Sequence, residues 1–188
     1  LATNSEWAAP VSLTDRRYFV VNVSDSRKND HDFFKNLIHE QTHGGSEALL
    51  QVLMDYDLSE FEVRNIPETP ARLEQKMLSM DILQKWWLNV LSDEDFTIGE
   101  KILDLENCNR IIISDLTTSF DEYAKEHNPK HRLWSVKRFC GQFRKLVSNV
   151  EVKRRGSGPR EYEFPPLNDC KSFFADKYSL DSNVFEIN

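Results

Sequence analysis

Long apolar runs and paired cysteines are both missing from this sequence of 188 residues. Its apolar runs, such as residues 19–21 and 111–113, are far shorter than the roughly 20 residues that a membrane span requires. The three cysteines, Cys108, Cys140 and Cys170, lie 32 and 30 residues apart, which matches neither a disulfide framework nor a close pair of metal ligands. We therefore expect no membrane segment and a reducing, cytoplasmic setting.

A phosphate-binding loop is also missing, because none of the six glycines is followed by lysine. The nucleophile motif of the serine hydrolases and the glycine pattern of dinucleotide-binding folds are missing as well. We therefore expect that the chain by itself neither hydrolyses ATP nor holds a cofactor.

The N-terminal residues do not resemble a secretory signal. They begin without Met and carry Asp15, Arg16 and Arg17 where a signal peptide would have a continuous apolar stretch. We expect this end to be the cut end of a longer chain.

Positive charge is concentrated in one segment, although the net charge of the chain is −7. Residues 130–160 contain ten Lys and Arg against the single acid Glu151, so the segment carries +9 and the remaining residues carry −16. A charge block is often only a solvated surface, but such an excess of one sign favours contact with a polyanion. The segment predicts a nucleic-acid-binding surface.

The first half of the chain predicts one strand followed by helices. Residues 17–23 (RYFVVNV) are aromatic and β-branched, as in a largely buried strand, whose partner strands the sequence does not contain. Asp30 can cap a helix that the glycines at 44–45 stop, and residues 46–56 predict a second helix. Thr69 before Pro70, and Asp81, are typical starts for two more helices, the last of which should bury Trp86 and Trp87.

The second half, after a boundary that we place near residue 92, has a different pattern. Ser114 can cap one helix, and Ser135 can cap another over residues 136–147. Apolar residues of the second helix should be buried, namely Val136, Phe139, Phe143, Leu146 and Val147. Residues 150–155 and 160–164 flank a turn with two glycines and predict a hairpin, before a last helix capped by Asn168 or Asp169.

One short motif suggests different chemistry. His39, Glu40 and His43 fit H-E-x-x-H, in which two histidines one helical turn apart bind Zn²⁺ and the glutamate acts as a base. Exposed histidines are common on amphipathic helices, and the glycines at 44–45 follow at once. We keep a zinc metallohydrolase as an alternative function and predict no metal site.

The order of these motifs resembles a family of phage and plasmid proteins. Residues 3–5 (TNS) and 15–19 (DRRYF) resemble the sensor asparagine, arginine finger and following strand of superfamily 3 helicases of the AAA+ class. Residues 30–34, 44–50 and 56–58 are similar to the helical continuation of these proteins, and the Trp pair, basic helix and Arg-rich hairpin resemble their C-terminal winged helix. The resemblance is to the helicase part of primase-helicases and phage primase-polymerases.

The resemblance implies an ATP-driven and Mg²⁺-dependent DNA helicase as the parent protein, which assembles in a ring with other copies of itself. Asn4 would orient the attacking water or sense the γ-phosphate, and Arg17, with Arg16 as the reserve, would reach the site of the neighbouring subunit. The alternative is that Asn4 caps a loop and both arginines are solvated at the edge of a strand.

A winged helix implies contact with single-stranded or forked DNA. The candidate phosphate contacts lie on the basic helix and the hairpin: Lys137, Arg138, Arg144, Lys145, Lys153, Arg154, Arg155 and Arg160. Such contacts give affinity without sequence preference. Two alternatives remain, namely a winged helix that contacts protein and a stand-alone DNA-binding or adaptor protein unconnected with ATP.

Together these inferences predict an α+β chain that is mainly helical and has three parts. Residues 1–24 would be a remnant of the AAA+ ATPase sheet, residues 25–92 a helical bundle, and residues 93–188 the winged-helix domain.

Overall fold

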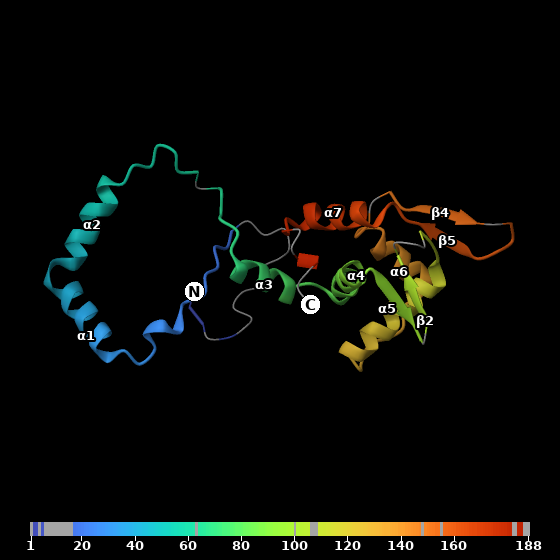
Figure 1. Cartoon of the computed structure of the whole chain (residues 1–188), viewed down its shortest axis with the longest axis horizontal. Coiled ribbons are helices and arrows are strands. Elements are labelled where there is room, and N and C mark those ends of the chain that lie inside the picture. The colour runs from blue at the N-terminus through green and yellow to red at the C-terminus, as the bar shows by residue number, and fades with distance from the viewer. Residues whose placement is uncertain are drawn as a thin grey trace. The chain divides into compact units, whose positions relative to one another are not determined.

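The computed structural model describes residues 2–3, 5, 17–62, 64–99, 101–105, 109–147, 149–154, 156–181 and 184–185 (Figure 1). The protein is α+β, as predicted, with helices predominating over small sheets. It divides into two compact units, one of residues Arg16–Arg72 and the other of residues Leu1–Asp15 with Leu73–Asn188. None of the described helices has both the length and the apolar character needed to cross a membrane.

The Arg16–Arg72 unit consists mainly of two helices. A 3-10 turn (Asp25–Arg27) precedes α1 (His31–Glu40), and a π-type segment (Gln41–Gly45) leads into α2 (Ser46–Asp55). Asp30 caps α1 as predicted, because its Oδ1 accepts a hydrogen bond of 3.0 Å from the Phe33 amide. Gly44 bends the chain between the helices with φ +96°, a conformation that a side chain would strain.

The predicted strand at residues 17–23 does not form. A strand needs the amide and carbonyl groups of a neighbour, and no described strand pairs with this segment. The Val20 carbonyl instead accepts a short hydrogen bond from the Thr69 hydroxyl. Apolar side chains that a strand would bury remain in solvent, with Phe19 exposed by 57% and Val23 by 91%.

Two helix starts in the middle of the chain follow the prediction. Helix α3 spans Pro70–Leu78, and the Thr69 hydroxyl accepts a hydrogen bond of 3.1 Å from the Arg72 amide. Helix α4 spans Ile82–Asp93 and begins with a capping box, in which Asp81 and Gln84 each accept a hydrogen bond from the other's backbone amide. These caps satisfy amides that the first turn of a helix would leave without a partner.

Two small antiparallel sheets follow α4. Strands β1 (Asp95–Ile98) and β2 (Lys101–Asp104) form a hairpin that the sequence pattern did not predict. The second sheet has the strand order β3-β5-β4, from β3 (Arg110–Ile112), β5 (Arg160–Glu163) and β4 (Glu151–Arg154). The β4–β5 hairpin confirms the prediction for residues 150–164, whereas β3 was not predicted.

Three helices complete this unit, and two of their predicted caps are wrong. Helix α5 spans Ile113–His127 and starts directly after β3, so Ile112 is at the N-cap and Ser114 lies within the first turn. Helix α6 spans Val136–Phe143, with the predicted cap at Ser135, and a turn rather than a helix continues to Leu146. Helix α7 spans Leu167–Tyr178 and has Pro166 at its N-cap, in place of Asn168 or Asp169.

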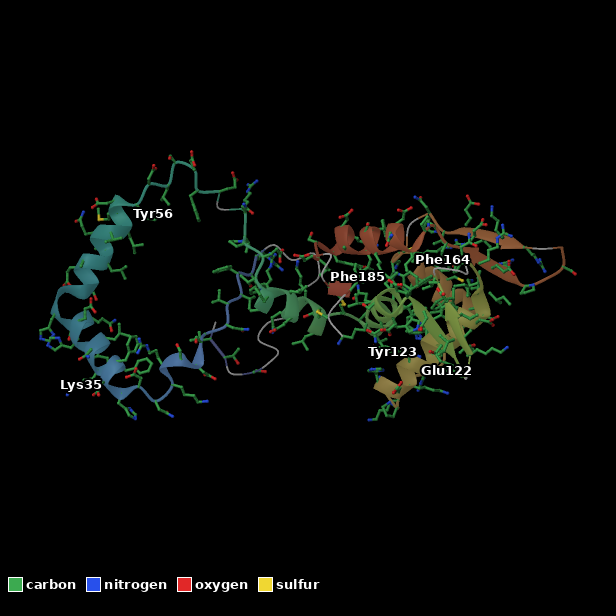
Figure 2. The ribbon with its side chains drawn as sticks, viewed as in Figure 1. Lys35, Tyr56, Glu122, Tyr123, Phe164 and Phe185 are labelled. Atoms are coloured by element: carbon green, nitrogen blue, oxygen red, sulfur yellow. The ribbon has the colours of Figure 1, made fainter. Side chains whose placement is uncertain are left out.

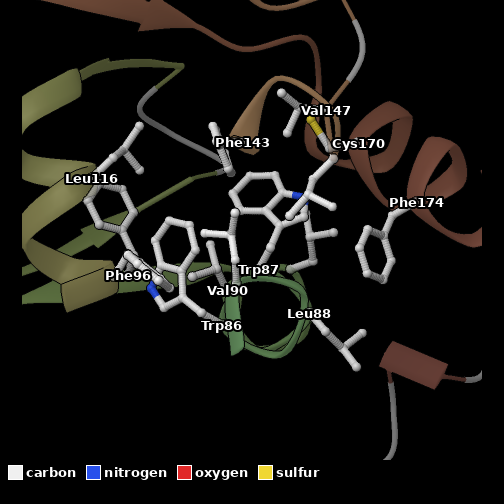
Figure 3. Close-up of a cluster of buried hydrophobic side chains, with 14 of the residues drawn as sticks. Trp86, Trp87, Leu88, Val90, Phe96, Leu116, Phe143, Val147, Cys170 and Phe174 are labelled. Atoms are coloured by element: carbon white, nitrogen blue, oxygen red, sulfur yellow. The ribbon is translucent and has the colours of Figure 1, made fainter. Parts of the chain in front are cut away.

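Helix α4 lies in the centre of the core of this unit (Figure 3). Trp86 and Trp87 are both buried, as predicted. The Trp87 ring meets the Phe143 ring edge-on, with the centroids 4.9 Å apart, and the Trp86 indole nitrogen donates to the Ser119 hydroxyl at 3.4 Å. Residues 73–92 therefore share one core with the segment after residue 92, where we expected a boundary.

A buried lysine joins α3 to the end of α7. The Lys76 side chain is 1% exposed, and its ammonium group donates a hydrogen bond of 2.8 Å to the Ser179 carbonyl, just beyond α7. The carbonyl end of a helix carries partial negative charge, so a cation at this position stabilises it. The contact holds together segments that are 103 residues apart in the sequence.

The loop before α6 is held by a buried carboxylate on α5. Asp121 accepts a hydrogen bond of 2.8 Å from the His131 imidazole and two of 3.1 Å from the Trp134 amide. Asp121 is 7% exposed, so water cannot readily replace these contacts. This carboxylate positions the start of α6.

Replacing Asp121 with Ala should lower the free energy of unfolding by about 2–3 kcal/mol, because partly buried donors on His131 and Trp134 would lose their acceptor. Thermal and urea denaturation would measure the change. Lys125→Ala, at an exposed position of the same helix, is the control and should have little effect. Equal stability of the two variants would show that the loop does not depend on Asp121.

Candidate nucleic-acid interface

The exposed side of α6 is basic. The two buried aromatic residues of the helix determine which side faces solvent. Phe139 and Phe143 are fully buried, and their rings stack at 5.0 Å. All four predicted cations of this segment are exposed, namely Lys137, Arg138, Arg144 and Lys145. Val136, which we expected to be buried, is 44% exposed because it faces a groove rather than the core.

The four cations form two pairs on different sides of α6. Lys137 and Arg144, seven residues apart, line a groove between α6 and the β4–β5 hairpin. Arg138 and Lys145, also seven apart, line a second groove toward the start of α4 and the end of α7. The Arg138 guanidinium lies over the Trp134 ring, 4.2 Å from its centroid, which orients it in this second groove.

The register of the hairpin separates its predicted cations by face. Cα partners in an antiparallel pair point to the same side of the sheet, and successive residues alternate. Arg154 is the partner of Arg160, and Val152 is the partner of the buried Tyr162, so these four side chains share the face toward α6. Lys153, on the opposite face, is the partner of Glu161.

Lys153 is neutralised locally by carboxylates. Its ammonium group forms ion pairs with Glu151 and with Glu163, the latter at 3.2 Å. The hydrogen bonds that Lys153 donates to these two carboxylates raise the pKa of Lys153, and those donated by Arg110 and Lys153 lower the pKa of Glu163. The structure thus separates Lys153 from the other predicted phosphate contacts.

Arg154 closes the turn of the hairpin. Its Nε donates a hydrogen bond of 2.8 Å to the Gly158 carbonyl, and one terminal nitrogen lies 3.5 Å from the Ser157 carbonyl. Gly156, with φ +55°, permits the tight turn. Arg155, which we also predicted as a contact, lies outside the described residues.

The groove between α6 and the hairpin has a volume of about 660 Å³, which is in the usual range for small-molecule pockets. Val136, Val152 and Pro159 give it apolar walls, and Cys140 and Gly141 form its α6 side. A β-carbon at Gly141 would have no heavy atom within 4 Å, so this position leaves open space. Lys137, Arg144 and Arg160 line the groove together, and no described carboxylate lines it.

A buried tyrosine hydroxyl lies behind this groove. Tyr162 is fully buried, and its hydroxyl makes no hydrogen bond of ordinary geometry with any described residue. Burial is the main cause that raises the pKa of Tyr162 to about 12, and the neighbouring Cys140 thiol adds to the rise, whereas Arg144 opposes it. The alternation of the sequence did not identify Cys140 as a groove residue or Tyr162 as its buried neighbour, because the hairpin meets α6 only in three dimensions.

Of the predicted motor residues, the structure describes only Arg17. Asn4 and Arg16 lie outside the described residues. Arg17 is exposed, at the start of the extended segment of the Arg16–Arg72 unit. Its proposed role in a neighbouring active site stays a prediction.

The H-E-x-x-H histidines lie at the bend after α1. The His39 and His43 rings stack with centroids 4.0 Å apart, and His43 Nδ1 is 2.8 Å from the His39 carbonyl. His43 has φ −123° and ψ 51°, so the regular helix that this motif needs is distorted there. In the described part of the chain, no group of three His, Cys, Asp or Glu side chains could hold a metal ion.

Tyr162→Phe should leave the free energy of unfolding at neutral pH unchanged or raise it by up to about 1 kcal/mol, because it removes a buried hydroxyl without a partner. The variant should also resist alkali better. The pKa of Tyr162 is raised from 10.0 to about 12, so this group costs the folded state no stability below pH 10 and lowers its stability progressively as the pH rises from 10 to about 12. Urea denaturation at pH 8 and pH 11 would measure both effects, and a parallel loss in the two proteins would contradict the second.

Comparison with protein-family models, curated protein sequences and solved structures finds no match to this chain.

Proposed function

We propose that residues 93–188, which share their core with residues 73–92, form a winged-helix module that binds DNA without sequence preference, as the C-terminal part of a phage-type replicative helicase. The observation that carries the proposal is the exposed basic surface made by Lys137 of α6, Arg144 directly after α6 and Arg160 of the hairpin. Three cations around a groove without described carboxylates suit the phosphates of a nucleic-acid backbone.

The order of elements supports the winged-helix interpretation. A winged helix places two helices after a short strand and then a hairpin, whose second strand pairs with that first strand. Here α5 and α6 follow β3, and the strand order β3-β5-β4 puts the second hairpin strand in the middle. In such a module α6 would face the nucleic acid, and the turn closed by Arg154 would be the tip of the wing.

The separation of cations by face refines the proposed interface. Lys137, Arg144, Arg154 and Arg160 share the side of the groove, and Arg138 with Lys145 extends the surface around α6. Lys153 is left out of the proposal because Glu151 and Glu163 already pair with it. Long cationic side chains on a helix and a hairpin reach phosphates, which carry no sequence information.

The Arg16–Arg72 unit supports the link to a larger protein. No described residue from 17 to 62 is buried, and apolar side chains stand out along both of its helices (Figure 2). Tyr56 is 65% exposed, and Ile38 and Leu53 are 60% exposed. An apolar surface of this kind is typical of an interface, and we propose that the ATPase sheet of the parent protein covers it.

In that parent, Arg17, with Arg16 as the reserve, would act as the arginine finger and Asn4 as the sensor of the γ-phosphate of ATP, with Mg²⁺ as the metal ion. The ring would consist of copies of the parent chain on single-stranded or forked DNA. A stand-alone DNA-binding protein would use the same α6 surface and differ only in having no ATPase partner. Measuring the ATPase activity of the parent protein with substitutions in α6 and the hairpin would separate these two functions.

Fluorescence-anisotropy titration with labelled single-stranded and duplex DNA at several salt concentrations would test the interface. Each phosphate contact that is lost should reduce the slope of log affinity against log salt by about 0.7 for single strands and about 0.9 for duplex DNA. The double variant Arg144→Gln, Arg160→Gln should therefore reduce the slope for single strands by about 1.4. Scrambling the DNA sequence should have little effect on the affinity.

Lys153→Gln is the matched control, because it removes one charge from the same hairpin on its opposite face. Its salt slope should equal that of the unaltered protein. An unchanged slope in the double variant would remove the groove from the interface. Zinc analysis of the same sample tests the alternative, because stoichiometric zinc would favour the histidines at 39 and 43.

A further inference from the structure

Cys140 is placed in the groove in a way that the proposed DNA contacts do not explain. It lies on α6, partly exposed, and lines the groove with Lys137 and Arg144. Lys137 precedes it by three residues and Arg144 follows it by four, so the helical repeat puts both cations on the same side as the thiol. The Arg144 amide donates to the Cys140 carbonyl at 3.1 Å, which confirms that the helical geometry extends this far.

A second observation points to a ligand at the thiol. The Tyr162 hydroxyl is a buried donor that makes no hydrogen bond of ordinary geometry with a described residue, and its polar neighbours are Cys140 and Arg144, which both line the groove. A thiolate sulfur accepts hydrogen bonds, so the hydroxyl would gain a partner when the Cys140 thiol loses its proton. Arg160 adds a third cation from the hairpin side of the groove.

We propose that Cys140 is a covalent modification site, at which a small acidic disulfide enters the groove and forms a mixed disulfide. The volume of about 660 Å³ is large enough for such a molecule. The apolar walls at Val136, Val152 and Pro159 contact its body, while Lys137, Arg144 and Arg160 attract its carboxylates. The site needs no bound nucleic acid, so it stands or falls separately from the proposed function.

The reaction is an ordinary thiol–disulfide exchange. The Cys140 thiol gives its proton to solvent, and the thiolate attacks one sulfur of the disulfide. A new bond forms between Cys140 Sγ and that sulfur, the original sulfur–sulfur bond breaks, and the other half leaves as a thiolate with the electron pair. The Cys140 sulfur is oxidised and the departing sulfur is reduced, so the entering disulfide is the only oxidant needed.

Cys170 offers a matched control in the same chain. It is buried, its thiol faces the Pro165 carbonyl at 3.7 Å, and burial raises the pKa of Cys170 to about 11. A buried thiol that keeps its proton is a poor nucleophile. The difference between the two cysteines therefore measures the effect of the groove.

The test uses the whole chain with Cys108 replaced by Ser, and follows modification of each remaining cysteine by mass spectrometry. The probes are the dianionic disulfide 5,5′-dithiobis-(2-nitrobenzoate) and the dicationic disulfide cystamine. Each rate is divided by the rate of the same probe with a free small thiol, which corrects for the different intrinsic reactivities of the two probes. At low salt, the normalised rate at Cys140 should be about tenfold higher for the anionic probe.

Three variants separate the causes. Cys140→Ser should abolish the fast modification, and Arg144→Gln with Arg160→Gln should remove most of the preference for the anionic probe. Tyr162→Phe should slow both probes alike, because it removes a hydrogen bond to sulfur and not a charge. High salt should bring the ratio of the two normalised rates close to one.

Equal normalised rates for the two probes at low salt would overturn the proposal, as would faster modification of Cys170 than of Cys140. Persistence of the anionic preference in the arginine double variant would also overturn it. Circular dichroism of each variant would exclude loss of folding as the reason for a changed rate.

Discussion

The burial of two aromatic rings of α6 against α4 is the interaction on which the rest of the C-terminal unit depends. Phe143 contacts Trp87 edge-on at 4.9 Å, and Phe139 lies 5.8 Å from the Trp86 ring. A helix that buries these two positions must turn its other faces to solvent, so the packing decides that Cys140 and the cations on either side of the two rings face outward. The basic surface and the groove are thus consequences of the core rather than independent features.

Much of the helical part of the structure could be predicted from local sequence. Asp30, Asp81 and Ser135 each cap a helix through a hydrogen bond to an amide three residues away, which is information within one turn of chain. Ser114 failed as a cap because β3 runs directly into α5, and that strand exists only through its pairing with β5. Strand β3 depends on partners about 50 residues away, which no local pattern contains.

The candidate site also has features that local sequence predicts and features that depend on distant parts of the chain. The exposed cations of α6 could be predicted from helical periodicity, because Phe139 and Phe143 mark the buried side. The side to which Lys153 points depends on the hairpin register, and one residue of difference in register would have moved it to the face of Arg160 and turned Arg154 to the opposite face. The groove itself joins a helix to a hairpin and so required the folded structure.

Gly141 shows that the shape of the groove and the stability of the fold are separable. The residue sits inside α6, where alanine would suit a helix better by about 1 kcal/mol, and a β-carbon there would contact nothing within 4 Å. The space beside Cys140 therefore depends on the missing side chain at position 141 as well as on the helix and the hairpin that form the walls of the groove. Small residues of graded size at this one position would act as a series of spacers, with which the width of the groove could be adjusted while its charges and its scaffold stay the same.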